Sequence, residues 1–389
     1  MNSRILLSTF LGAIIPYEVL SQETGTAKQT LSLGLEISSF NEETLDEDGT
    51  QVFAPLHYTF SNQRFDFGVK TAFLHGERKS SHSGGAGSVS SLSDTAVSAS
   101  YRAFAGDVEW LGGRRATLAL NTDINLPTGQ EQLSGSEKNA VFDGFIVDHD
   151  RYGEGLNFGI GLSSTITLDS QTLLGFGFSY NIRGDYSPDG DQPDQELAPG
   201  NHKVASIQLL RSTPQYQWNL GYRVIDEDVT KVNGVATYDR ATSHEIFASG
   251  AYAINDIWSI RSSASLSTRG ADSLRDATTG ALVQAERDDN GDSSYFSVGV
   301  SKRLSERDTL SLDLSRRYRA ANDFDESNFS FAPSLERKEI RLGYQRSLNA
   351  QTILEGSLGY FEVEEGTILG FSGPKYEGFT LSIGVSHEF

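Results

Sequence analysis

Eight arginines lie on strand-like stretches of the sequence, in step with the polar residues of each stretch and out of step with its apolar ones. They are Arg102, Arg115, Arg183, Arg223, Arg261, Arg317, Arg319 and Arg341. Guanidinium groups that share a water-facing surface can set up a field that selects among small charged solutes. Alternatively, they are solvated side chains paired with acids such as Asp123, Asp313 and Glu355 on the same surface. Both interpretations place these arginines on the wet side of their strands.

The segment from Pro127 to Gly153 is the longest connection between such stretches, and it is acidic. Its acids are Glu131, Glu137, Asp143, Asp148 and Asp150, opposed by Lys138 and Arg151. The apolar run VFDGFIV at 141–147, which contains Phe142 and Phe145, interrupts them. An exposed run of this kind promotes association, so a buried or inserted position is expected. The segment is predicted to fold inward as a constriction, with a solvated lid outside the molecule as the alternative.

The triplet Asp148-His149-Asp150 is the strongest candidate for catalysis. A carboxylate beside an imidazole can orient a general base or activate water, and outer-membrane proteases of the omptin kind use acids and a histidine at the top of a barrel. Adjacent side chains on a loop rarely point at one substrate, and the other histidines have no metal-ligand spacing. The sequence also contains no Cys. It therefore predicts no enzymatic activity, no cofactor and no metal.

Several long connections carry clusters of acids. The spacing Asp288-x-Asn290-Gly291-Asp292 matches the first half of a calcium loop, but the distal glutamate of such a loop is missing. These clusters could bind divalent cations that bridge to lipopolysaccharide, or they could simply keep exposed loops soluble. The formal net charge of -20 argues against a nucleic-acid partner, because nucleic acid is bound by Lys and Arg that neutralise phosphates.

The elements that position these residues are runs of about ten residues in which apolar and polar residues alternate. The run at 309–319 places Leu310, Leu312 and Leu314 on one side and Thr309, Ser311 and Asp313 on the other. Alternation with period two indicates a β-strand with two different faces. About sixteen such runs follow residue 29, with fourteen and eighteen as neighbouring counts. The fold class is therefore all-β, a transmembrane antiparallel up-and-down β-barrel with an apolar outside and a wet lumen.

The connections between the runs alternate between short and long. Short polar links and long loops on opposite ends are typical of outer-membrane barrels, whose turns are short on the periplasmic side. Trp110, Trp218 and Trp258 all fall in or beside short links, as expected of an interfacial aromatic girdle. On this count the segment from Pro127 to Gly153 is the third external loop. This organisation resembles that of sixteen-strand general porins, in which the third loop narrows the pore.

The last residues, Thr380 to Phe389, alternate up to the carboxyl terminus. This ending resembles the aromatic terminal signature of bacterial outer-membrane barrels, and a closed barrel pairs its last strand with its first so that no edge remains. The resemblance implies the outer membrane of a Gram-negative bacterium and recognition of the strand ending at Phe389 by the barrel-assembly machinery. Residues 1–22, with Arg4 before the apolar stretch from Ile5 to Ile15, are predicted to be a signal peptide. A buried first helix is the alternative, and residues 23–389 form the barrel.

The stretch from Ser93 to Asp185 resembles one family in particular. It contains LALNTDINLPTGQ at 118–130, in which Pro127, Thr128 and Gly129 end a strand before a long loop, and then two Gly-rich strands joined by a tight turn. This pattern is similar to the outer-membrane barrels of the phenol-degradation meta-pathway family. The resemblance implies transport of aromatic or other hydrophobic compounds.

The predicted function is an outer-membrane channel for passive uptake of small solutes, including aromatic or hydrophobic compounds. Its lumen is filtered by the inward arginines and by the acidic third loop. Outer-membrane lipid and lipopolysaccharide are the expected surroundings, and a homo-oligomer is left open. A different class of function is a surface barrel that acts through its loops, as an adhesin, a secretion or assembly partner, or a hydrolase. A soluble periplasmic β-protein is a further alternative.

Overall fold

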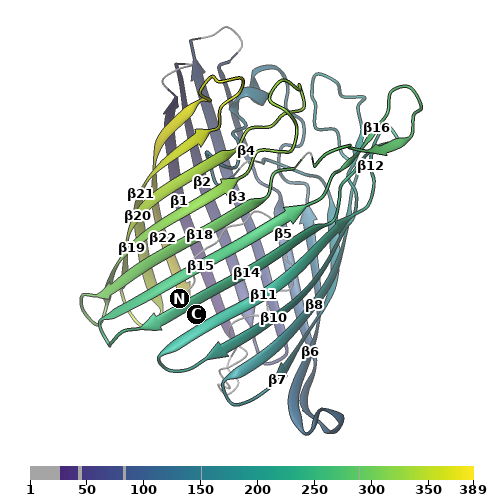
Figure 1. Cartoon of the computed structure of the whole chain (residues 1–389). Coiled ribbons are helices and arrows are strands. Elements are labelled where there is room, and N and C mark those ends of the chain that lie inside the picture. The colour runs from purple at the N-terminus through teal and green to yellow at the C-terminus, as the bar shows by residue number, and fades with distance from the viewer. Residues whose placement is uncertain (1–26, 43–45, 82–84, 150, 289) are drawn as a thin grey trace.

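The computed structural model describes residues 27–42, 46–81, 85–149, 151–288 and 290–389, and they form one closed antiparallel barrel (Figure 1). The predicted signal peptide, residues 1–22, lies outside the described residues. Sixteen long strands make up the wall, and their count agrees with the alternation in the sequence. These are β1 (Lys28–Glu42), β2 (Glu47–Ser61), β3 (Phe65–Ser80), β5 (Thr95–Val108), β6 (Arg114–Leu126), β7 (Asn157–Thr167), β8 (Thr172–Arg183), β10 (His202–Ser212), β11 (Tyr216–Glu227), β14 (Ser243–Ala253), β15 (Trp258–Arg269), β18 (Ser293–Arg303), β19 (Asp308–Arg319), β20 (Leu335–Ser347), β21 (Thr352–Glu365) and β22 (Lys375–Glu388).

The barrel closes between its first and last strands. β1 pairs with β22 from Thr30 opposite Glu388 to Glu42 opposite Tyr376. The amide of Phe389 adds a final hydrogen bond of 2.9 Å to the carbonyl of Gln29. Every wall strand therefore has a neighbour on both sides, and no unpaired edge remains. This is the architecture of an outer-membrane β-barrel, which the terminal strand predicts.

The two faces of the wall differ as the alternation predicts. Leu312 and Leu314 of β19 are about half exposed on the outside, and so are Phe379, Leu381 and Ile383 of β22. The inward side chains are mostly small or polar, and many of them bond across strands, as in Thr117 with Thr165, Ser263 with Ser297 and Ser357 with Ser382. The outside therefore suits hydrocarbon and the inside suits water. None of the helices in the described part of the chain is long and apolar enough to cross a membrane.

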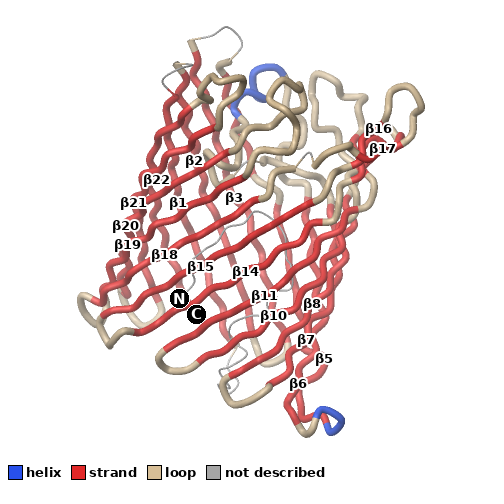
Figure 2. Tube along the Cα trace, viewed as in Figure 1, coloured by secondary structure: helices blue, strands red, loops and turns tan. Residues whose placement is uncertain are grey.

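The short turns follow one local rule. In the turns that begin near Asn62, Asn255 and Asn349, the side-chain oxygen of that asparagine accepts hydrogen bonds from the amides two and three residues later. Such an Asx turn reverses the chain in few residues. These turns gather at the lower end of the barrel in Figure 2, opposite the long loops.

The connection between β5 and β6 departs from the prediction. The alternation of apolar and polar residues predicts a strand from Asp94 to Phe104, but β5 continues to Val108. A 3-10 helix, η2 (Glu109–Leu111), then forms the turn. A register shift between Arg102 and Phe104 reverses the alternation there, so the pattern falsely indicates a loop. This hairpin extends below the other turns in Figure 2, and Trp110 at its tip is 82% exposed.

Some long connections contain strands that the sequence analysis takes for loops. β4 (Gly87–Leu92) folds back along β3. A second, five-stranded sheet stands above the wall at the long-loop end (Figure 1). It consists of β9 (Leu197–Ala198), β12 (Thr230–Val232), β13 (Val235–Asp239), β16 (Ser273–Arg275) and β17 (Leu282–Gln284). These strands are two to five residues long, which is too short for the alternation to be visible in the sequence.

The two faces of β22 provide a test of the membrane setting. Replacing the outward Ile383 with Arg is expected to cost about 2–4 kcal/mol of unfolding free energy, because the guanidinium would meet hydrocarbon. Ser382→Arg, one residue away on the inward face, is the matched control and should cost much less. Urea unfolding of the barrel in lipid vesicles, followed by heat-modifiable gel migration, measures both. Equal losses for the two variants would contradict the assignment of faces.

Candidate functional site: a loop anchored inside the barrel

The loop at residues 127–156, between β6 and β7, is tied at its neck by one carboxylate. Asp94 accepts hydrogen bonds from the amide of Gly129 at 2.9 Å, the amide of Glu154 at 2.7 Å and the side chain of Asn125 at 2.6 Å. The first two donors stand at opposite ends of the loop. One side chain on the neighbouring connection therefore closes the loop at its base.

The Pro-Thr-Gly sequence at 127–129 has a structural role at this neck. Pro127 ends the strand because it has no amide hydrogen for the ladder. The hydroxyl of Thr128 donates to the carbonyl of Ser93 at 2.9 Å and lies 2.8 Å from the hydroxyl of Thr95. A Cβ at Gly129 would lie 2.0 Å from the carbonyl oxygen of Tyr152, so only glycine fits between the two ends of the loop.

The middle of the loop lies against the inner wall of the barrel. Phe142, Ile146 and Val147 are buried, and they form an apolar cluster with Phe40 of β1 and with Leu335, Phe361 and Val363 of β20 and β21. Phe40 and Phe142 meet edge to face, with ring centroids 5.0 Å apart. A second cluster packs Ala140 and Tyr152 against Phe53, Ala72 and Leu74 of β2 and β3. The loop thus buries its apolar run inside the barrel, where a lid outside the molecule would not place it.

Arginines of the wall hold the loop by its backbone. Arg337 of β20 donates from Nη1 to the carbonyls of Phe145 at 3.0 Å and Ile146 at 2.9 Å, and Arg317 of β19 donates to the carbonyl of Gly144 at 2.7 Å. Arg337 is only 4% exposed, and its guanidinium lies 4.2 Å from the centroid of the Phe361 ring. The guanidiniums of Arg317 and Arg319 cover the ring of Phe145.

Asp148 is the acid that faces this arginine cluster. Its carboxylate lies 4.0 Å from Arg317, 3.9 Å from Arg337 and 3.9 Å from Arg341. Burial alone would raise the pKa of Asp148, but the three guanidiniums outweigh burial and lower it. Arg341 also pairs with Glu339 at 2.6 Å. Asp148 is therefore ionised at neutral pH and attracts the loop to the wall.

Arg337 is absent from the arginines predicted to face inward, which include Arg317, Arg319 and Arg341. The signal was available, since Arg337 is four residues before Arg341 on the same strand and therefore on the same face. Its position next to the buried Leu335 at the start of β20 suggests a loop boundary more than a wall position. Only the packed loop shows that this arginine is the most buried of the group.

His149 and its neighbours do not form a catalytic couple in the described residues. The His149 ring stacks on Phe53, and its backbone carbonyl accepts a hydrogen bond of 2.6 Å from Gln51. Burial lowers the pKa of His149 to about 4, so the ring is neutral at pH 7. Asp150 lies outside the described residues. His149 and Asp148 thus contact different partners, an aromatic ring and an arginine cluster.

Two predicted constriction acids stabilise the loop locally. Glu137 closes a capping box at the start of the 3-10 helix η3 (Gly135–Ala140), where it accepts a hydrogen bond of 2.9 Å from the amide of Ser134. That bond is the main reason its pKa is lowered. Asp143 accepts a bond of 2.7 Å from the amide of Phe145. Glu131 differs, since it lines a cavity near the loop neck.

The remaining arginines lie on the wall away from the docked apolar run of the loop at 141–147. Arg223 pairs with Glu245, and Arg261 pairs with Asp313, whose Oδ1 lies 2.9 Å from Nε. Arg183 contacts His202 and Glu227 at the long-loop end. Arg102 donates to the carbonyl of Gln63 in a short turn, and Arg115 is the second residue of β6 at that same end. Of the wall acids named from the sequence, Asp313 pairs with Arg261, and Asp123 accepts a hydrogen bond of 3.1 Å from the side chain of Asn181.

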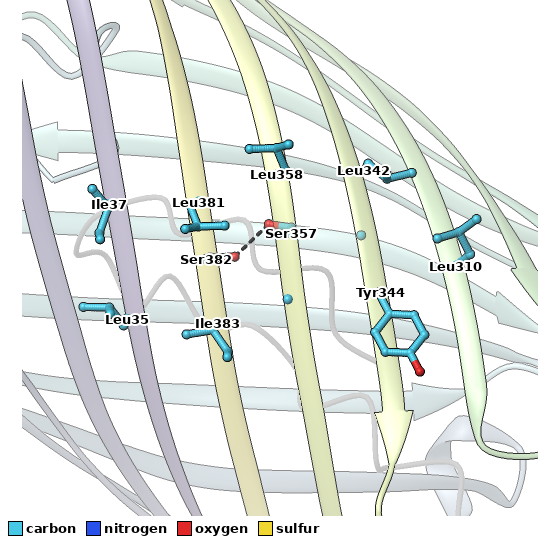
Figure 3. A pocket seen from close by; sticks show the side chains of 12 residues that line it. Leu35, Ile37, Leu310, Leu342, Tyr344, Ser357, Leu358, Leu381, Ser382 and Ile383 are labelled. Atoms are coloured by element: carbon cyan, nitrogen blue, oxygen red, sulfur yellow. Dashed lines mark hydrogen bonds between the residues drawn. The ribbon is translucent and has the colours of Figure 1, made fainter.

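A shallow apolar groove of about 430 Å³ lies on the outer face, across β19 to β22 and β1 (Figure 3). Leu35, Leu358, Leu381 and Ile383 surround Gly356, which contributes no side chain there. Figure 3 also marks the hydrogen bond of 2.7 Å between Ser357 and Ser382, whose side chains belong to the inward face. Since the groove opens outward between lipid-facing side chains, it is not on a path through the lumen.

No family model matches the chain, and no curated protein matches it in sequence. Solved structures of similar shape include a monoaromatic hydrocarbon channel, CymD, at 12% identity, with 93% of this chain and 88% of that chain covered and a TM-score of 0.44. An anion-selective porin from Comamonas acidovorans has 13% identity, coverage of 94% and 100%, and a TM-score of 0.42. An outer-membrane channel from Pseudomonas putida F1 has 11% identity, coverage of 96% and 99%, and a TM-score of 0.40. Identities and TM-scores this low do not identify a solute for this chain. The resemblance to the phenol-degradation family remains a prediction from the sequence.

Removing the Arg337 anchor should release the loop. Arg337→Met keeps much of the side-chain volume but loses hydrogen bonds to two carbonyls, and bonds from a charged group contribute about 1.5–3 kcal/mol each. Limited proteolysis of the folded barrel should then cut within residues 127–156 at least tenfold faster than in the parent. Arg261→Met, which breaks an ion pair elsewhere on the wall, should leave this rate unchanged. Equal rates in all three proteins would show that Arg337 does not hold the loop.

Acid should loosen the same loop through His149. The pKa of His149 is about 4 in the folded protein and 6.5 in the unfolded chain. Above pH 6.5 the ring is neutral in both states and does not destabilise the docked loop. As the pH falls from 6.5 towards 4, the unfolded chain binds the proton more readily, so the docked loop becomes increasingly less stable. Asp148 has a lowered pKa and stays ionised over this window. Proteolytic cleavage of the loop is expected to accelerate between pH 6.5 and 4.5, and less so in His149→Phe. The same acid response in both proteins would assign it to other groups.

Proposed function

We propose that this barrel is an outer-membrane channel for passive diffusion of small solutes, with residues 127–156 as a fixed constriction. The observation that carries the proposal is the anchoring of an acidic loop inside the barrel by Arg317, Arg337 and Arg341. The loop packs on the inner wall of β1 to β3 and of β20 and β21. The wall of β6 to β15 keeps polar inward side chains, such as Asn121, Asp123 and Ser263. Solutes would pass between that wall and the loop.

Selection in this channel would come from width and charge. The inward arginines are the proposed filter of the lumen, and the ion pairs of Arg223 and Arg261 leave alternating charges along the open wall. Aromatic or hydrophobic cargo is the finer proposal, and it is supported by the resemblance of residues 93–185 to the phenol-degradation family. The other proposed partners are lipopolysaccharide at the long-loop end and the assembly machinery at Phe389, which is 63% exposed. A homo-oligomer is a further part of this proposal.

A surface protein acting through its loops is supported less well. Its hydrolase form needs His149 to reach a substrate, whereas the His149 ring is stacked on Phe53 of β2. His149→Ala should therefore leave any hydrolysis by the purified barrel unchanged.

Single-channel recording tests the constriction. Replacing residues 135–149 with a short Gly-Ser linker keeps the Asp94 neck and removes the part that covers the inner wall. Stable ohmic steps are expected from the parent in a planar bilayer, and steps at least twofold larger from the shortened protein, because the cross-section of the lumen increases. A matched linker replacing residues 276–281 between β16 and β17 should not alter the step size. The absence of any steps from the parent would overturn the channel.

A further inference from the structure

A cavity of about 440 Å³ lies at the long-loop end of the barrel. The constriction proposed above does not assign a function to this cavity. The cavity is lined by both ends of the loop at 127–156, by the connection between β8 and β10, by the ends of β8 and β11, and by Thr230 and Arg240 in the connection between β11 and β14. Its volume is within the range of about 300–1,000 Å³ that is usual for small-molecule sites. The chemistry of its lining indicates which molecule it suits.

One wall of the cavity carries excess positive charge. Glu227 is buried and lies 3.2 Å from Arg240, 3.5 Å from Arg183 and 2.7 Å from His202. Two guanidiniums therefore share a single carboxylate. The side chain of Arg240 is 42% exposed, so its guanidinium can still meet a ligand. An anionic group is the natural partner for this wall, because a guanidinium binds a carboxylate through paired hydrogen bonds.

A second part of the lining carries an acid that has no cationic partner among the described residues. Glu131 lines the cavity, and among the described residues no cation forms an ion pair with its carboxylate. Burial, and then the nearby Asp94, raise the pKa of Glu131, which shows that its surroundings do not compensate its charge. Glu154, by contrast, is paired with Arg151. A cationic group bound near Glu131 would supply the missing charge.

The two walls belong to one site. The hydroxyl of Tyr186, which also lines the cavity, lies within electrostatic range of both Arg183 and Glu131, so the two charged groups lie near the same ring. Leu133, Val141 and Leu197 add apolar surface to the lining of the cavity. A ligand with opposite charges at one end and an apolar body would satisfy both walls and cover the apolar lining.

We propose that this cavity binds a small zwitterion with an apolar body, of the kind represented by an aromatic α-amino acid, before the molecule enters the lumen. The carboxylate of the ligand would meet Arg240 and Arg183, and its ammonium would meet Glu131. The inference rests on the proposed channel function and narrows its solute class. A hydrophobic hydrocarbon would leave both charged walls unsatisfied, and burial of charges without partners is unfavourable.

Calorimetric titration of the full barrel in detergent tests the site with three probes at pH 7. These are L-phenylalanine, 3-phenylpropionate, which lacks the ammonium, and 2-phenylethylamine, which lacks the carboxylate. L-phenylalanine should bind at least tenfold more tightly than either of the others, since each missing group loses one charged contact.

Substitutions in the cavity test each charged contact separately. Glu131→Gln should weaken the binding of L-phenylalanine about tenfold and leave the affinity for 3-phenylpropionate unchanged. Arg240→Gln should weaken L-phenylalanine and leave 2-phenylethylamine unchanged, while Arg240→Lys should restore part of the affinity.

Glu286→Gln, on an exposed loop away from the cavity, is the matched control and should bind all three probes as the parent does. Equal affinity for the three probes, no binding heat from L-phenylalanine, or an equal loss in Glu131→Gln and Glu286→Gln would overturn the proposal. Heat-modifiable gel migration confirms that each variant is a folded barrel. Single-channel steps in KCl alone report the channel independently. Binding without steps would sink the proposed channel and leave the zwitterion site standing, whereas steps without binding would do the reverse.

Discussion

Every backbone amide and carbonyl that faces hydrocarbon needs a partner within the protein, because lipid offers none. The pairing of β1 with β22 meets this requirement for the first and last strands. Closure has a second consequence, because each strand then has one face towards lipid and one towards water. The apolar groove around Gly356, the serine and threonine pairs of the inner wall, and the inward arginines all follow from that division. The way the loop packs inside the barrel also depends on this wet lumen.

A polar lumen is a poor place for the apolar run at 141–147. The structure resolves this conflict by placing apolar residues on the inward faces of a few strands, at the level where the loop docks. Phe40, Leu335, Phe361 and Val363 interrupt an otherwise polar surface and pack on Phe142 and Val147. The backbone carbonyls of the same loop would still be buried without partners, and Arg337 and Arg317 supply the donors. Hydrophobic burial and charge-assisted hydrogen bonding thus act on the same short segment, and Asp94 closes it at the base.

Charge has two different uses in this molecule. Around Asp148 and Glu339, three guanidiniums meet two carboxylates and the backbone carbonyls of the loop, and these contacts hold the loop in place. Around Glu227 and Glu131, the charges are separated on two walls of a cavity and are only partly compensated. Guanidiniums that bind the carbonyls and the carboxylate of a docked loop are structural, whereas charged groups that line a cavity can bind a ligand. Residues of one type, identified by one pattern in the sequence, therefore have distinct roles.

The sequence by itself predicts the barrel, about sixteen wall strands and the face of most wall residues, because alternation with period two is a local property of the chain. It also places Pro127 and Gly129 at the mouth of the long loop. Tertiary structure alone decides that this loop docks on β1 and β20 to β21, that Arg337 is the buried anchor, and that His149 meets Phe53. It likewise brings Glu131 into the lining of one cavity with Arg240, which lies more than a hundred residues away in the sequence. Such contacts join segments distant in sequence, and they depend on register and loop path, for which no local pattern codes.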